Sequence, residues 1–138
     1  MALVEWQDAY SVGHGGVDFA HRQIIDSINE LHEAMTRGKA SEVLGAIATK
    51  LVRYTKGHFA QEEQLMAQIG YPQLEQHKKI HRRLVAQVIE LDRRIKAKTA
   101  AVGIETMAFL RTWLTDHILK YDQQYARLIP DRPQPAPR

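Results

Sequence analysis

The sequence predicts an all-α protein, an up-down-up-down four-helix bundle preceded by an N-terminal arm. Four stretches place apolar residues three and four positions apart, which is the spacing of one helix face. Short connections separate these stretches and favour antiparallel neighbours, and no stretch shows the alternation of a strand. We expect one domain over residues 1–128 and a separate tail over residues 129–138.

Residues 1–17 form the expected arm, because they contain a glycine-rich turn and no repeating apolar pattern. Asp18 is a favourable N-cap for the first helix. Gly38 is expected to end that helix, because the helical pattern stops there. The inner face of the helix consists of Val17, His21, Ile24, Ile25, Ile28, Leu31 and Met35.

The second helix is expected to begin at Ser41 and to end at Gly70, since Gly-Tyr-Pro at 70–72 stops one helix and starts the next. The third helix follows Pro72 and runs to about residue 95. The fourth begins near Ile104 and ends near residue 128. Four of the five prolines lie in the tail, which we therefore expect to be disordered.

The composition narrows the classes of function. The charged fraction of 25% is ordinary for a globular protein, and no apolar run approaches the roughly 20 residues that cross a bilayer. The first ten residues lack the pattern of a secretory signal, so we expect a cytoplasmic protein. The net charge of +3 comes without a basic patch interleaved with aromatics, so we expect no nucleic-acid partner. Cysteine is absent, so a metal would be held by nitrogen and oxygen.

Histidines and carboxylates gather at one end of the predicted bundle. Residues four apart share a helix face, and both the His58/Glu62 pair and the His77/His81 pair have this spacing. In an up-down-up-down bundle, the starts of helices one and three lie level with the ends of helices two and four. This level holds His21, His58, Glu62, His77, His81, His117 and Asp122.

Asp122 needs a local distortion to join this group. It follows His117 by five residues, about 140° round an ideal helix. We therefore expect the helix to deform there or the side chain to reach across. We do not expect His14 and His32 to belong to this group. His14 is expected in a flexible loop, and His32 lies about 16 Å along the helix from His21.

Buried imidazoles and carboxylates are costly in an apolar bundle unless a cation satisfies them. Nitrogen and oxygen ligands suit iron, zinc or manganese. Five imidazoles are more than one six-coordinate ion with two carboxylates could use, which favours two ions. If both carboxylates and one further oxygen bridge the ions, one octahedral position stays open for a small ligand.

The motifs around these residues resemble those of the bacteriohemerythrins, over roughly residues 6–125. The resemblance implies a non-haem di-iron centre with an oxo or hydroxo bridge, which binds O2 reversibly for storage, transport or delivery and has no enzymatic activity. The motifs are Asp18-x2-His21, His58-Phe59-x2-Glu62-Glu63-x2-Met66, Tyr71-Pro72-x4-His77-x3-His81 and Trp113-Leu114-x2-His117-x4-Asp122-x2-Tyr125.

The resemblance also implies a role for each site residue. One iron would be held by His77, His81 and His117, the other by His21 and His58, and both would be bridged by Glu62 and Asp122. The O2 molecule would bind at the iron with two histidines. Its apolar pocket would be formed by Phe59, Trp113, Leu114 and Ile118.

One departure from the family pattern concerns the residue before the first histidine. Family members often carry Gln or Glu there, whereas this chain has Ala20. If the polar group orients the ligand or blocks solvent, this site is more open. An Ala20→Gln change should then lengthen the lifetime of the oxygenated state.

Three other functions use similar metals. They are a di-iron oxidase, peroxidase or nitric-oxide-handling enzyme, a sensor of O2, nitric oxide or iron, and a zinc or iron store. Di-iron enzymes in bundles typically use four carboxylates and two histidines. This site has five histidines and two carboxylates, which favours reversible binding. We expect a monomer whose partners are O2 and an oxygen-consuming enzyme.

Overall fold

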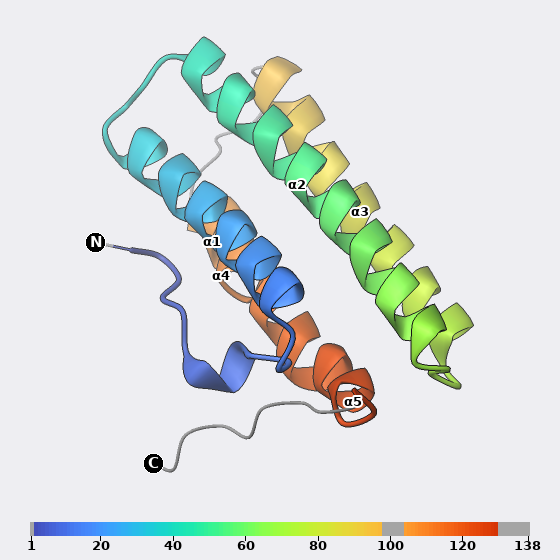
Figure 1. Ribbon diagram of the computed structural model, residues 1–138. Helices are drawn as coiled ribbons and strands as arrows, with labels where there is room; N and C mark the ends of the chain where they lie inside the picture. The colour runs from blue at the N-terminus through green and yellow to red at the C-terminus, as the bar shows by residue number, and fades with distance from the viewer. Residues whose placement is uncertain (1, 98–103, 130–138) are drawn as a thin grey trace.

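The computed structural model describes residues 2–97 and 104–129, and it confirms the all-α class (Figure 1). Its four long helices are α1 (Gly15–Thr36), α2 (Ser41–Gln68), α3 (Leu74–Ala97) and α4 (Ile104–His117). The last continues through a π-helical turn, η2 (Ile118–Asp122), into the short α5 (Gln123–Ala126). Helix α2 lies beside α1 and α3, and α1 contacts α4. Residues 130–138 of the predicted tail lie outside the described residues.

Two glycines end helices where the sequence predicts. Gly38 follows α1 with a φ of +65°, and Gly70 follows α2 with a φ of +70°. After each glycine, the next backbone N–H donates to a carbonyl five residues earlier at 2.9 Å. This is the Schellman arrangement, which satisfies the last carbonyls of a helix and reverses the chain. The two reversals align the end of α2 with the starts of α1 and α3.

The start of α1 differs from the prediction. Asp18 is not the N-cap. His14 takes that place, and its Nδ1 accepts a hydrogen bond from the N–H of Val17 at 3.2 Å. Asp18 instead accepts from the N–H of Val12 at 2.9 Å and from the hydroxyl of Ser11 at 2.6 Å. Its carboxylate therefore ties the arm to the helix, and the expectation that His14 lies in a flexible loop is wrong.

The N-terminal arm packs against the bundle. It contains a 3-10 turn, η1 (Asp8–Tyr10), and buries Val4 and Val12. The side chain of Asn29 in α1 both accepts from the N–H of Val4 and donates to its carbonyl, at 2.9 and 2.8 Å. Gln123 donates to two carbonyls of the arm from the other side. The arm is thus fixed to the first helix and to the end of the fourth.

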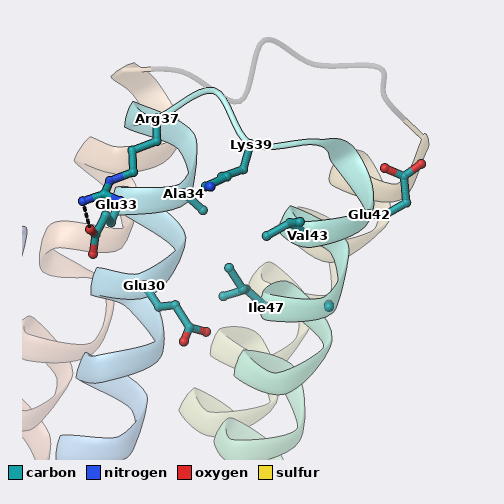
Figure 2. Close-up of a pocket in the computed structure, with 9 residues that line it drawn as sticks. Glu30, Glu33, Ala34, Arg37, Lys39, Glu42, Val43 and Ile47 are labelled. Atoms are coloured by element: carbon teal, nitrogen blue, oxygen red, sulfur yellow. Dashed lines mark ion pairs between the residues drawn. The ribbon is translucent and has the colours of Figure 1, made fainter.

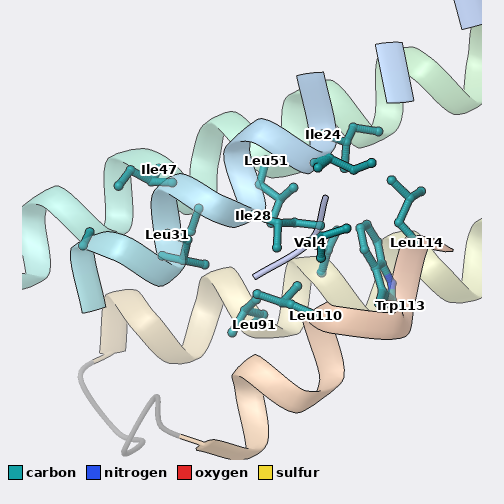
Figure 3. Packing of buried hydrophobic residues seen from close by; sticks show 14 of the residues in the cluster. Val4, Ile24, Ile28, Leu31, Ile47, Leu51, Leu91, Leu110, Trp113 and Leu114 are labelled. Carbon is teal, nitrogen blue, oxygen red and sulfur yellow. The ribbon is translucent and has the colours of Figure 1, made fainter. Parts of the chain in front are cut away.

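The apolar core forms two clusters. The larger one runs along the bundle and draws on the four long helices and the arm (Figure 3). The smaller one closes the end of the bundle near the turn between α2 and α3, and contains Val12, Val17, Met66, Tyr71, Tyr125 and Ala126. Along α1, α2 and α4, the predicted site histidines lie between residues of the two clusters. Within the described residues, no helix is both long and apolar enough to cross a membrane.

Candidate metal centre

The structure brings the seven predicted site residues together in the interior of the bundle. Each is at most 3% exposed. His21 comes from α1, and His58 and Glu62 from successive turns of α2. The other four come from α3, from the last residue of α4 and from the end of η2. His32 is half-buried on α1 and lies outside the groups of side chains that could share an ion.

Three histidines face one oxygen of each carboxylate. The Oε1 atom of Glu62 lies 2.9 Å from Nε2 of His81 and 3.5 Å from Nε2 of His77. The Oδ1 atom of Asp122 lies 3.0 Å from Nε2 of His77 and 3.0 Å from Nε2 of His117. These five side chains form one potential metal-binding group.

Two histidines face the other oxygens of the same carboxylates. The Oε2 atom of Glu62 lies 3.0 Å from Nε2 of His58 and 3.3 Å from Nε2 of His21. The Oδ2 atom of Asp122 also lies 3.3 Å from Nε2 of His21. Each carboxylate therefore places one oxygen on the three-histidine side and one on the two-histidine side.

The separations fit ligands of octahedral ions. Two adjacent ligands about 2.1 Å from an octahedral ion stand about 3.0 Å apart, close to most of the nitrogen–oxygen distances above. Several of these atoms are buried without a hydrogen-bond partner among the described residues, namely Nε2 of His21 and His58, Oε2 of Glu62 and both oxygens of Asp122. Such atoms are costly to bury unless a cation satisfies them. The donor set therefore fits two cations.

A π-helical turn resolves the spacing of His117 and Asp122. Residues Ile118–Asp122 form η2, in which hydrogen bonds join residues five apart, so side chains five apart lie about one turn from each other. Both side chains consequently reach the three-histidine side. The expected deformation is confirmed, and it takes the form of a π turn.

The sequence of the whole bundle matches a known family. The family model described as Hemerythrin HHE cation binding domain matches residues 14–129. The chain belongs to the hemerythrin family. Members of this family use a di-iron centre that binds O2, and the buried histidines and carboxylates of this chain suit such a centre.

Relatives and solved structures agree with this assignment. The chain is 39% identical to a bacteriohemerythrin of Stenotrophomonas maltophilia, over 91% of this chain and 81% of that protein. It is 32% identical to a myohemerythrin of Riftia pachyptila, over 87% of this chain and 88% of that protein. A crystal structure of wild-type hemerythrin superposes with a TM-score of 0.81 at 32% identity, covering 90% of this chain and 95% of that chain.

The four predicted pocket residues of this chain are buried. Phe59, Trp113, Leu114 and Ile118 are each at most 5% exposed. The ring of Phe59 stacks on the imidazole of His81, with centroids 3.9 Å apart and parallel planes. It also lies within 5.8 Å of His58 and His117, measured between centroids, so it contacts both sides of the centre. The other three belong to the larger apolar cluster.

Sequence reasoning missed two neighbours of the centre. Glu63 places its Oε2 atom 2.8 Å from Nδ1 of His81, on the side of the ring that faces away from Glu62. Tyr125 is completely buried, with its ring 5.8 Å from that of His77. Both residues belong to the quoted motifs, but spacing alone gives them no role.

The charges of the metal-free cluster follow from the same contacts. Burial lowers the pKa of His21 and His77, but the carboxylates of Asp122 and Glu62 outweigh it and raise both pKa values to about 9. Burial lowers the pKa of His58. The pKa values of Glu62 and Asp122 fall well below the ordinary range, because the histidines outweigh the opposing effect of burial. The carboxylates therefore favour the protonated forms of His21 and His77.

A groove of about 590 Å³ lies at the other end of the bundle. It runs between the end of α1 and the start of α2 (Figure 2). Its rim mixes charges of both signs, including the Glu33–Arg37 ion pair of 2.9 Å. It contains none of the site residues.

Proposed function

We propose that this protein binds O2 reversibly at a di-iron centre, for oxygen storage, transport or delivery. The observation that carries the proposal is the division of Glu62 and Asp122, whose two oxygens face different groups of histidines. A carboxylate that presents one oxygen to each side can bridge two ions. Five neutral imidazoles then complete two unequal ligand sets. A di-iron centre held there would supply the redox chemistry of reversible O2 binding.

The protein's own residues would hold and separate the two irons. On one side, His77, His81 and His117 would join the two carboxylates and the bridging oxygen, which fills all six coordination positions of the ion. On the other side, His21 and His58 leave one position open, and O2 would enter there. The imidazoles add no charge, so the two bridging carboxylates compensate only part of the charge of the ions.

The apolar wall would keep the O2 complex dry. Phe59, Trp113, Leu114 and Ile118 offer no carboxylate or amine that could deliver a proton. Water is also excluded from such a surface. Exclusion of water and proton donors by these side chains would then slow irreversible oxidation of the centre.

The donor set supports a binding protein rather than an enzyme. Five histidines and two carboxylates supply fewer anionic ligands than the four-carboxylate enzymes of similar bundles, and so stabilise high-valent iron less. We also propose that the protein is a cytoplasmic monomer and that it has no nucleic-acid partner. An oxygen-consuming enzyme is the proposed recipient.

An oxygen titration tests this function. The iron-reconstituted, diferrous protein is titrated with O2 under anaerobic conditions, followed by its visible spectrum, and then purged with inert gas. We expect a charge-transfer band that appears with O2 and disappears on purging, over repeated cycles. Immediate conversion to a stable diferric spectrum would support an oxidase, a redox sensor or a nitric-oxide enzyme instead.

A further inference from the structure

A second groove, of about 460 Å³, reaches the metal centre from outside. It lies between α2 and α3, and its lining includes Phe59, Glu63 and His81. The imidazole of His81 connects the two environments. Its Nε2 atom lies 2.9 Å from Glu62 in the interior, and its Nδ1 atom lies 2.8 Å from the partly exposed carboxylate of Glu63. One ring therefore separates the groove from the three-histidine side.

The lining of this groove combines apolar and charged side chains. Ala60, Val85 and Ala86 supply apolar surface, and Ile89 is 40% exposed beside them. Lys56 from α2 and Arg82 from α3 line the same groove from opposite helices. Neither cation forms an ion pair with an acid of residues 2–97 or 108–129.

Further cations extend this basic surface. Arg53 lies one turn before Lys56 on α2, and Lys79 one turn before Arg82 on α3. Both are exposed and, in the described part of the chain, pair with no carboxylate. The nearby acids are engaged: Glu63 faces His81, and Glu75 pairs with Lys78. The groove therefore combines apolar surface with an excess of positive charge.

We propose that the groove between α2 and α3 docks an acidic one-electron carrier protein, which reduces the oxidised centre through His81. The inference rests on the proposed di-iron function. A reversible O2 carrier that has oxidised to the diferric state must be reduced before it can bind O2 again. Two encounters would each pass one electron, so that two ferric ions become ferrous while two carrier molecules are oxidised. Each transfer moves one electron and leaves the covalent bonds of both proteins unchanged.

The location of the groove suits this task. It meets the centre on the three-histidine side, so a docked carrier would not occupy the open position on the two-histidine side. The parallel Phe59 and His81 rings both line the groove and would provide a compact route to the metal. Electron-transfer complexes are small and transient, and opposite charges mainly raise their association rate. A groove that joins apolar surface to cations without ion-pair partners in the described ranges fits a small, transient complex with an acidic protein.

Stopped-flow reduction of the diferric protein tests the proposal. The probe is a reduced plant-type [2Fe–2S] ferredoxin with an acidic surface, and sodium dithionite serves as a small reductant. In a K56Q/R82Q variant, we expect the second-order rate with ferredoxin to fall about tenfold at low salt. The matched control K39Q/R111Q, which removes two exposed cations elsewhere, should stay within about twofold of the parent.

Salt and dithionite separate docking from damage to the centre. High salt should slow ferredoxin with the parent and leave little difference between parent and K56Q/R82Q. Dithionite should reduce all three proteins at the same rate. Equal ferredoxin rates for the groove variant and the control, or a slower dithionite reaction in the groove variant alone, would overturn the proposal.

Cross-linking gives a readout that needs no iron. A carbodiimide joins ferredoxin carboxylates to lysines of this protein at their contact, and mass spectrometry then locates the bonds. We expect them at Lys56 and Lys79, not at Lys39 or Lys120. Bonds spread evenly over the lysines would contradict the docking site. A protein that cross-links as expected but forms no diferric spectrum would instead count against the proposed function.

Discussion

The two ends of this bundle are held together in different ways. Away from the centre, the core is a run of aliphatic and aromatic side chains whose burial stabilises the fold without directional contacts (Figure 3). At the centre, seven ionisable side chains occupy positions that apolar residues would otherwise fill. There the contacts are electrostatic, and the carboxylates of Glu62 and Asp122 raise the pKa values of His21 and His77.

This difference separates folding from binding. The apolar end and the smaller cluster beyond the histidines frame the site on both sides. We therefore expect the chain to keep its helical fold without metal, and metal to replace protons at the ligands. Changes at one end should leave the other largely intact.

Loss of a bridging carboxylate should have the largest effect. Glu62→Gln keeps the size of the side chain but removes the charge that faces both groups of histidines. We expect iron content to fall from two ions per chain to less than one, while the circular dichroism of the metal-free protein stays helical. Glu42→Gln, an exposed change on the same helix, is the control. Retention of two irons by Glu62→Gln would show that Glu62 is no bridge.

Variants that remove a histidine from one side only should show whether the two ligand sets bind iron separately. His58→Ala removes one of only two imidazoles on its side, and His81→Ala removes one of three on the other. We expect each variant to bind about one iron per chain, measured by elemental analysis after reconstitution and desalting. The ion that remains should be the one on the unaltered side. Both variants losing both ions would contradict two separable ligand sets.

A cavity in the apolar end should lower the stability of the fold and leave the iron content unchanged. Leu51 is completely buried in the larger cluster, and Leu51→Ala should reduce the free energy of unfolding by about 2–5 kcal/mol. Denaturant unfolding of the metal-free protein measures this loss. Iron content should stay at two per chain, because no ligand of the centre moves. A loss of iron without a loss of stability would break the proposed separation between the two ends.

Between pH 6.5 and pH 9, the stability of the protein without metal should fall as pH rises. His21 and His77 have pKa values raised to about 9, against 6.5 for the unfolded chain, so their contacts with the carboxylates stabilise the fold fully below pH 6.5. This stabilisation is lost as pH rises through 9. We expect the Tm of the metal-free protein to fall over this range. The zinc-loaded protein should not show that fall, because ligated imidazoles carry no proton.

The smallest expected effect concerns the helix cap beside the centre. His14→Ala removes the acceptor for the N–H of Val17 and should cost about 1 kcal/mol. His14→Asn, which keeps an acceptor, should recover most of it. Thermal unfolding of the metal-free proteins measures both. Equal Tm values for His14→Ala and the parent would mean that the arm, held by Asp18, fixes this end of α1 without the cap.

Much of this architecture could be predicted because it follows from spacing. Gly38 and Gly70 end their helices since only glycine readily adopts the left-handed conformation that closes them. The end-to-end alignment of four antiparallel helices then places the histidines at one level. The match of residues 14–129 to the hemerythrin family agrees with that reasoning.

Other features depend on contacts that spacing does not encode. Asp is a residue type that N-caps favour. In the folded protein, however, the Asp18 carboxylate accepts a hydrogen bond from the backbone of the arm. The five-residue spacing of His117 and Asp122 predicts a deformation without saying whether the backbone or the side chain yields. The contact of Glu63 with His81 joins two helices, so it appears only once α2 and α3 are placed side by side.

A crystal structure of the iron-loaded protein, with anomalous data at the iron edge, tests the central claim most directly. We expect two anomalous peaks about 3.5–4 Å apart. One should lie within bonding distance of His21 and His58, the other of His77, His81 and His117. Glu62 and Asp122 should each give one oxygen to each peak. A single peak, or a carboxylate with both oxygens on one ion, would contradict the bridged two-ion centre.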